Sequence, residues 1–361
     1  MKYIEEYRNR DIIRSLAAQI KSEAGREYIF MEVCGGHTAA IHRFGIPSLL
    51  PPDIRLVSGP GCPVCVTSRE YIDRVIACSG LKDVIVATFG DLLRIPGSDT
   101  SMEKKKAAGA DIRVVLSALD ALSLAAGNPK KKVLFPAIGF ETTAPGTAVT
   151  IKEADRAGVD NFFILSAHKI MPPAMEILIK DGTRLDGFIC PGHVAAVTGS
   201  KIFGFIPERY GLGCVVTGFE PTDLLQAIYM LVKQVNANKP ENQIQYARAV
   251  TFSGNETAVN LMDEVFVTGD DYWRGFGIIP GSGLKLRPEY ERFDAEKAMP
   301  VAVKTREDEK ACICGEILRG LKTPDQCVLF GSRCRPDNPV GACMVSNEGA
   351  CNTFFKYRSD V

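Results

Sequence analysis

Six of the twelve cysteines lie in the last fifty residues, and their spacing favours a metal centre. They are Cys312, Cys314, Cys327, Cys334, Cys343 and Cys351. Glycine, proline and aspartate are too frequent around them for long helices or strands, so thiolates around a metal would have to hold the segment. Successive cysteines are 2, 13, 7, 9 and 8 residues apart, without the C-x₂₋₄-C pairs of a zinc site, which favours an iron-sulfur cluster. Structural disulfides are the alternative, and they require an oxidising compartment.

Three further cysteines each follow a predicted strand in the N-terminal part of the chain. The strand YIFMEV runs into Cys34, and the strand IRLVSGP runs into the C-P-V-C string of Cys62 and Cys65. Parallel strands end at one edge of a sheet, so the three sulfurs are expected to converge. They would form either a metal site with three thiolate ligands or a redox dithiol beside a lone cysteine. The lone cysteine would lie at a helix N-terminus, which favours the thiolate form. The alternative is a buried apolar Cys34 and a simple turn.

Two histidines and one glutamate also stand beside predicted strand ends. His37 lies in the string C-G-G-H-T, and His193 lies in the similar string C-P-G-H-V. Either imidazole could bind a metal, relay a proton or donate a hydrogen bond, although a lone histidine is more often structural. Glu141, in the string G-F-E-T-T, follows another strand and could point into a cleft as an acid or a ligand.

The overall composition argues against several classes of partner. The chain has 361 residues, of which 46% are hydrophobic and 24% charged, as in an ordinary globular protein. Its 43 basic and 43 acidic side chains cancel, so no charge excess indicates nucleic acid or an anionic membrane. The apolar runs are too short for a membrane span, and the charged N-terminus is unlike a signal peptide. A cytoplasmic location is expected, where cysteine clusters indicate metal or redox chemistry.

Predicted strands alternate with predicted helices, which indicates an α/β fold with parallel sheets. The string at Cys34 matches the string at Cys190 at an offset of 156 residues, and a second match links Gly59 with Gly218 at 159. The matches suggest two related α/β domains facing a cleft, although strings this short can also match by chance. We expect a first α/β domain over residues 1–125, completed by 246–300, a second over 126–245, and a cysteine-rich iron-sulfur region over 301–361.

Several strings of the chain together resemble the HypD family of hydrogenase maturation factors. They are MEVCGGHT, SGPGCPVCV, GFETTAPGT, ICPGHV, and in the tail CxCG, PDQC, FGSRC and PVGACMVSNEGAC. The resemblance implies a scaffold on which the Fe(CN)2CO unit of [NiFe]-hydrogenase is assembled. It also implies two partners, a HypC-type small chaperone whose N-terminal cysteine shares the iron, and a HypE-type donor of the cyanide groups.

The resemblance also implies a role for each cysteine by its position in the motifs. The iron-site and partner-binding cysteine falls on Cys34, and the family's dithiol falls on Cys62 and Cys65. Its [4Fe-4S] cluster falls on four tail cysteines, Cys312, Cys327, Cys334 and Cys351. Cys314 and Cys343 are left as a second redox pair, a division that resembles ferredoxin:thioredoxin reductase. The sequence alone permits other choices of the four ligands.

Two other functions stay open at this point. A thiol-disulfide oxidoreductase would use Cys62 and Cys65 with the cluster as electron donor, and it would reduce a general disulfide with turnover. A zinc-stapled binding protein would have no redox role, and it would contain zinc without iron or sulfide.

Overall fold

Parallel strands form two sheets in the computed structural model, which describes residues 5–357. Sheet A has the order β2-β1-β7-β8-β9, which are Ile54–Ser58, Tyr28–Glu32, Gly187–Pro191, Gly213–Thr217 and Asn242–Ile244. Sheet B has the order β4-β3-β5-β6, which are Ile112–Val114, Val84–Thr88, Lys132–Gly139 and Phe162–His168. All neighbouring strands within the two sheets are parallel. The expected α/β class is confirmed.

Sheet A is buried on both faces, as the continuous apolar runs of its strands predict. One face carries Phe30, Ile189 and Val215. It packs against four helices, α1 (Arg10–Glu23), α2 (Gly35–Arg43), α3 (Ile46–Leu49) and α12 (Pro221–Asn236). The other face packs against α9 (Met171–Lys180), α10 (Gly192–Thr198), α11 (Phe205–Tyr210) and the C-terminal tail.

Sheet B is also covered on both faces. The face with Val86 and Leu134 packs against α5 (Arg69–Cys78), α6 (Met102–Ala107) and α14 (Ala295–Ala298). The face with Phe135 and Ile164 packs against α7 (Ala118–Gly127), α8 (Ala144–Ala157) and α13 (Glu256–Val265). Four short 3-10 helices complete the connections, η1 (Glu5–Arg8), η2 (Gly90–Arg94), η3 (Ser200–Phe203) and η4 (Pro288–Phe293). Over residues 5–357, no helix combines the length and apolar character needed to cross a membrane.

The grouping of strands does not follow the expected boundary between residues 125 and 126. Strands β3 and β4 lie before that boundary, yet they share sheet B with β5 and β6. Strands β1 and β2 share sheet A with β7, β8 and β9. The chain leaves sheet A through α4 (Pro63–Val66) and returns to it through α9. The alternation of strands and helices along the sequence predicts parallel sheets. It does not determine which strands are neighbours in a sheet, because strand pairing depends on which buried faces pack together.

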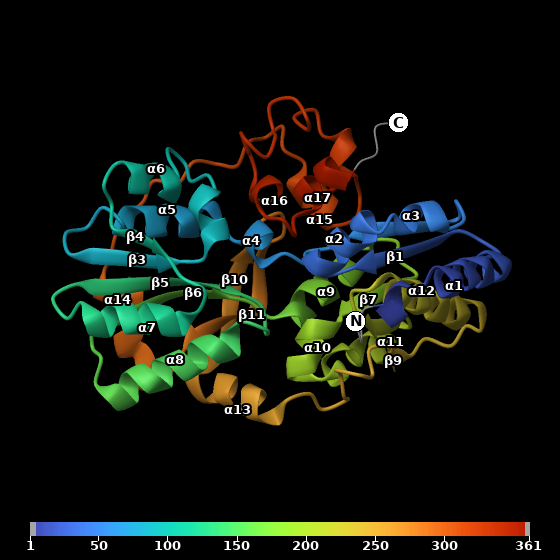
Figure 1. Cartoon of the computed structure of the whole chain (residues 1–361), viewed down its shortest axis with the longest axis horizontal. Helices are drawn as coiled ribbons and strands as arrows, with labels where there is room; N and C mark the ends of the chain where they lie inside the picture. The colour runs from blue at the N-terminus through green and yellow to red at the C-terminus, as the bar shows by residue number, and fades with distance from the viewer. Residues whose placement is uncertain (1–4, 358–361) are drawn as a thin grey trace.

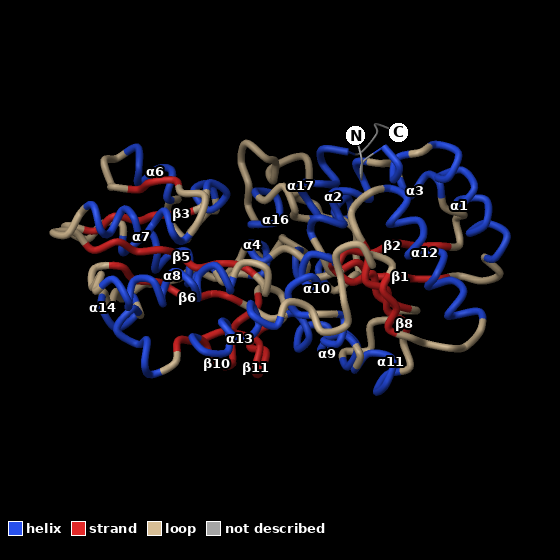
Figure 2. Tube along the Cα trace, turned by 60° about the horizontal axis from the view of Figure 1, so that its bottom comes forward, coloured by secondary structure: helices blue, strands red, loops and turns tan. Residues whose placement is uncertain are grey.

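Residues 246–300 pack against both sheets, because Val265 joins the core of sheet B whereas Val250 and Trp273 join the core of sheet A. The expectation that they complete a domain of residues 1–125 stays a prediction. Strands β10 (Phe266–Trp273) and β11 (Gly277–Leu286) form an antiparallel hairpin. The hairpin contacts β6 and α9, and α13 contacts α8. Figure 2 shows the hairpin beside α13, next to the strands of sheet B.

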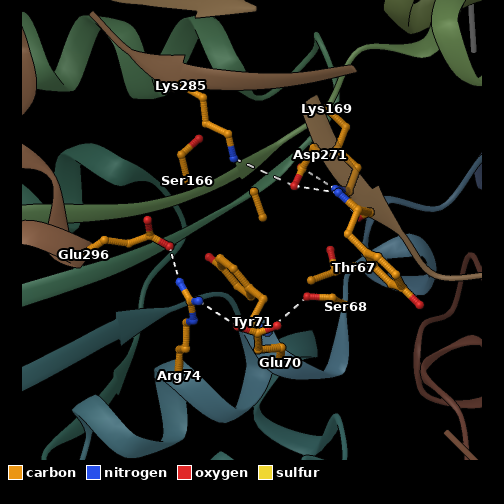
Figure 3. A pocket seen from close by; sticks show the side chains of 12 residues that line it. Thr67, Ser68, Glu70, Tyr71, Arg74, Ser166, Lys169, Asp271, Lys285 and Glu296 are labelled. Carbon is orange, nitrogen blue, oxygen red and sulfur yellow. Dashed lines mark hydrogen bonds and ion pairs between the residues drawn. The ribbon is translucent and has the colours of Figure 1, made fainter. Parts of the chain in front are cut away.

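A buried lysine joins this hairpin to sheet B (Figure 3). Lys169 follows β6, is 1% exposed, and donates hydrogen bonds from Nζ to the Asp271 carboxylate and to the Tyr272 carbonyl. Lys285 of β11 lies 3.8 Å from the same carboxylate, and these residues line a cavity of about 160 Å³. Burial lowers the pKa of Lys169, and the neighbouring Asp271 carboxylate opposes that shift. Asp271 therefore compensates a charge that the fold has removed from water.

Replacing Asp271 with asparagine should lower the free energy of unfolding by about 3 kcal/mol, because the buried Lys169 ammonium loses its counter-ion. Urea denaturation followed by circular dichroism measures this loss. The matched control is Lys285→Gln, which removes an ammonium that is 47% exposed from the same carboxylate, and it should cost less than about 1 kcal/mol. Equal losses for the two variants would contradict this account of Lys169.

The C-terminal tail has little regular structure, as its composition predicts. Its short helices are α15 (Cys314–Leu318), η5 (Pro324–Gln326), α16 (Ala342–Val345) and α17 (Ala350–Tyr357). Figure 1 shows the tail in red and orange above the junction of the two halves, over α4 and α2. Helix α17 contacts α2, and α16 contacts α4. The tail therefore covers the two helices whose N-cap residues are Cys34 and Cys62.

Candidate thiol and metal site

Cys34 occupies the loop between β1 and α2, at the carboxyl edge of sheet A. It is the N-cap residue of α2 and its side chain is buried, with 2% of the residue exposed. Its backbone N–H donates to Glu32 Oε2 at 3.1 Å. The next N–H, that of Gly35, donates to the Gly61 carbonyl at 2.9 Å. The loop that leads to Cys62 is thus held directly against Cys34.

Gly61 lies so close to Cys34 that a larger residue cannot be accommodated. A Cβ added there would lie 2.2 Å from the Cys34 backbone nitrogen and 2.4 Å from its Cα. We expect Gly61→Ala to lower the free energy of unfolding by about 1–3 kcal/mol, because the obstructing atoms are backbone. The control is Gly25→Ala, where nothing lies within 4 Å, and it should change little. Urea denaturation of both variants measures the difference, and two equal values would contradict this close approach.

The structure brings His193 to Cys34. Strands β1 and β7 are neighbours, with Glu32 paired to Ile189, so the loops after them lie side by side. His193 Nδ1 lies 3.7 Å from Cys34 Sγ, and its ring stacks on Phe219 with centroids 5.3 Å apart. The two strings that match at an offset of 156 residues therefore belong to one sheet and supply the two sides of one site.

His37 contacts the same aromatic ring as His193. It is fully buried, its Nε2 lies 3.3 Å from the Thr217 carbonyl, and its ring centroid is 4.7 Å from that of Phe219. Among the described residues, its Nδ1 has no hydrogen-bond partner. Burial lowers the pKa of His37 to about 3 and that of His193 to about 4. Both imidazoles are therefore neutral near pH 7, the form that can bind a metal.

The free thiol of Cys34 does not have the lowered pKa that its place at a helix N-terminus predicts. Burial raises its pKa well above the usual value, and the nearby Glu348 and Glu32 side chains raise it further. Burial likewise raises the pKa of Glu32 to about 8. The cost of placing a charge in this dry site exceeds the benefit of the helix dipole. Binding of a metal cation would reverse that balance, because the cation replaces the thiol proton.

Cys62 and Cys65 form a disulfide at the start of α4, with Cα atoms 5.3 Å apart. Their sulfurs are bonded to each other, so they do not join Cys34 in the three-thiolate site that was one expectation. Across residues 5–357, no three histidine, cysteine, aspartate or glutamate side chains are arranged to hold a single metal ion. The geometry corresponds to the other expectation, a redox pair beside a lone cysteine.

Glu141 has a structural role in α9. Its Oε1 accepts a hydrogen bond from the Met171 backbone N–H at 2.8 Å, at the first residue of that helix. Burial raises the pKa of Glu141 to about 7. Unlike His193, it has no hydrogen bond to Cys34 among the described residues. Its other oxygen, Oε2, has no hydrogen-bond partner among the described residues, and the expectation that Glu141 acts as an acid or a ligand stays a prediction.

The six tail cysteines gather into one group. Cys314 Sγ lies 3.1 Å from Cys343 Sγ, which in turn lies 3.4 Å from Cys351 Sγ. Cys312 has Cys314, Cys327 and Cys334 as electrostatic neighbours, and burial raises its pKa to about 12. Cys343 thus lies close both to its implied redox partner and to one implied cluster ligand, and the division of the six cysteines stays a prediction.

The remaining tail sulfurs fit an iron-sulfur cluster in their chemistry. Cys334 Sγ accepts a hydrogen bond from the Val340 backbone N–H at 3.4 Å, the kind of contact that stabilises a cluster thiolate. Cys351 has Cys312 and Cys334 among its electrostatic neighbours, so sulfurs that are far apart in the sequence lie near one another. A [4Fe-4S] cluster spaces its ligands more widely than a single ion, because each cysteine binds a different iron.

Comparison with known proteins places the chain in a family. The HypD family model, described as "Hydrogenase formation hypA family", matches residues 11–358. The chain belongs to the HypD family. Hydrogenase maturation factor HypD of Cupriavidus necator is 46% identical over 99% of this chain and 97% of its own length. HypD of Azotobacter vinelandii is also 46% identical, and a putative hydrogenase expression/formation protein of Methanocaldococcus jannaschii is 44% identical over 91% of each chain.

Membership of the HypD family gives this chain a role in hydrogenase maturation. Two of the strings that carry the family resemblance, around Cys34 and His193, are the ones that meet across sheet A. Sequence reasoning missed Phe219, which follows β8 and packs against the rings of both His193 and His37. The sequence match between Gly59 and Gly218 pointed to the loop after β8, but it did not assign a role to Phe219, the residue after Gly218.

Proposed function

We propose that this HypD-family chain is the scaffold on which the Fe(CN)2CO unit of [NiFe]-hydrogenase is assembled. The observation that carries the proposal is the packing of the cysteine-rich tail on α2 and α4, whose N-cap residues are Cys34 and Cys62. A metal-binding thiol, a redox pair and a group of six further thiols thus share one region. A protein that binds iron and also keeps it reduced needs this combination.

Cys34 is proposed to hold the iron atom, which is the cargo of the reaction. Its thiol is free and has no cysteine partner, whereas the partly exposed His193 imidazole lies 3.7 Å away. A neutral imidazole at this distance can bind the iron or donate a hydrogen bond to a ligand on it. Phe219 covers the imidazole and limits the access of water.

The tail is proposed to supply electrons to this site. Cys312, Cys327, Cys334 and Cys351 would hold a [4Fe-4S] cluster, which transfers single electrons when bound. Cys314 and Cys343 are close enough to exchange between dithiol and disulfide, and Cys62 and Cys65 are already a disulfide. Reduction of these pairs would keep the Cys34 site in the reduced state that iron(II) chemistry requires.

Two protein partners are part of this proposal. A HypC-type small chaperone would share the iron through its N-terminal cysteine, and a HypE-type protein would deliver the cyanide groups. The burial of Cys34 means that such partners must approach through the side where His193 is partly exposed. Support for these partners comes from membership of the family.

Infrared spectroscopy of the protein purified without oxygen, together with its small chaperone, tests this proposal. Iron-bound cyanide and carbon monoxide absorb where proteins do not, so their bands should appear with wild-type protein and disappear with Cys34→Ala. Metal and sulfide analysis of the same sample should find iron and sulfide. Zinc without iron or sulfide would overturn the proposal and favour a zinc-stapled binding protein.

A thiol-disulfide oxidoreductase is a second candidate, favoured by the Cys62–Cys65 disulfide and by the 3.1 Å separation of Cys314 and Cys343. It predicts turnover of a general disulfide substrate by the reduced protein, with loss of turnover in Cys65→Ser. A protein that carries iron and its diatomic ligands but shows no such turnover is the scaffold and not the oxidoreductase.

A further inference from the structure

A cavity of about 230 Å³ opens beside the tail cysteines, away from Cys34. The turn of the β10–β11 hairpin forms one wall, and the start of the tail forms the other. Its lining residues include Arg69, Arg274, Asp308, Glu309, Cys312 and Cys314. Its size admits a molecule of a few heavy atoms.

Arg274 is a buried cation in the wall of this cavity. It is 5% exposed, and among the described residues its Nε and Nη2 have no hydrogen-bond partner. The nearest carboxylate is that of Asp308, whose Oδ2 lies 3.5 Å from Arg274 Nε. A buried guanidinium with unused N–H groups is costly unless an acceptor is present. The unused donors therefore indicate a ligand that carries negative charge.

The carboxylates of the cavity already have closer partners. Asp308 Oδ1 lies 2.9 Å from Arg69 Nη2, and a Glu309 oxygen lies 3.2 Å from Arg333 Nη1. Asp308 therefore shares its carboxylate between Arg69 and Arg274, and its contact with Arg274 is the longer of the two. The charges of the lining residues cancel, so the feature that an anionic ligand would satisfy is the pair of Arg274 nitrogens without a hydrogen-bond partner among the described residues.

The position of Arg274 connects it to the thiol groups on both sides. Its backbone N–H donates to the Val66 carbonyl at 2.7 Å, in the helix that carries Cys62 and Cys65. The next residue, Gly275, approaches Gly315 so closely that an added Cβ would lie 2.7 Å from the Gly315 Cα. The cationic group is therefore fixed beside Cys314.

We propose that this cavity binds a small anionic thiol, with its carboxylate on Arg274 and its sulfur toward Cys314. The proposal rests on the proposed function, because it needs Cys314 and Cys343 to act as a redox pair. A ligand that interacts with both sides of the cavity must carry a negative group that binds the Arg274 guanidinium and a sulfur that reacts with Cys314.

The reaction at this site is a thiol-disulfide exchange. The bound thiolate attacks Cys314 Sγ of the oxidised pair, a mixed disulfide forms, and Cys343 leaves as a thiolate. A second molecule of the thiol attacks the external sulfur of the mixed disulfide and releases the Cys314 thiolate. The pair gains two electrons, and the two external thiols leave as one disulfide.

The test compares two thiols of similar size, mercaptoacetate, which is anionic, and 2-mercaptoethanol, which is neutral. Reduction of the oxidised pair in the complete protein is followed by alkylation and mass spectrometry of Cys314 and Cys343. Each rate is divided by the rate of the same thiol with a small neutral disulfide. The normalised rate for mercaptoacetate should exceed that for 2-mercaptoethanol by about tenfold, as expected for one charge-assisted hydrogen bond.

Arg274→Gln should remove this preference, and Arg274→Lys should keep part of it because the charge remains. Arg292→Gln, an exposed arginine paired with Asp155, is the matched control and should behave like wild type. If wild type and Arg274→Gln prefer mercaptoacetate equally, the proposed role of the cavity is wrong, but the proposed scaffold function is unaffected. If neither thiol reduces the pair, the redox pairing fails, and this proposal fails with it.

Discussion

Replacing Cys34 with alanine should reduce hydrogenase maturation to background while leaving the visible absorbance of the tail unchanged. The Cys34 thiol is the free sulfur 3.7 Å from His193, and it is the proposed ligand of the iron. Alanine removes that ligand but keeps the backbone hydrogen bonds of Cys34 and Gly35 to Glu32 and Gly61. Hydrogenase activity in cells that lack the native gene, together with the spectrum of the purified variant, measures both effects.

The control for this experiment is Cys78→Ala. Cys78 is another buried, free cysteine, but it lies on α5 and packs in the core of sheet B. Its loss should cost some stability and leave maturation intact. A fully active Cys34→Ala protein would refute the role assigned to Cys34, and an inactive Cys78→Ala protein would show that lost packing alone explains the defect.

Replacing Cys327 or Cys334 with serine should abolish the visible absorbance of an iron-sulfur cluster and loosen the tail. The tail has few long elements of regular structure, so metal ligation must supply much of its stability. Visible spectroscopy of protein purified without oxygen measures the chromophore. Limited proteolysis measures the loosening, and cleavage within residues 301–357 should become much faster.

Cys314→Ser is the matched control within the same tail. Under the proposed division, Cys314 belongs to the redox pair with Cys343, so its loss should leave the chromophore in place. If Cys314→Ser loses the chromophore and Cys327→Ser retains it, Cys314 is the cluster ligand and Cys327 is not. An unchanged spectrum in both Cys327→Ser and Cys334→Ser would count against both as ligands.

Much of the local structure and chemistry of this protein can be predicted from its sequence. The apolar runs that precede Cys34, Cys62 and His193 predict buried parallel strands, and a helix follows each strand closely. The cysteine spacing and the glycine- and proline-rich tail predict a region held by sulfur. These features are local, because strand periodicity and turn chemistry act over a few residues.

Only the tertiary structure determined which of these local features meet. It placed β1 beside β7, which brought His193 to Cys34, and it left Glu141 as a cap on α9. It also buried Cys34 enough to raise its pKa, where the helix N-terminus alone predicts the opposite. Strand order, burial and close approach all depend on how apolar faces far apart in the chain pack together, and no short string of residues encodes that packing.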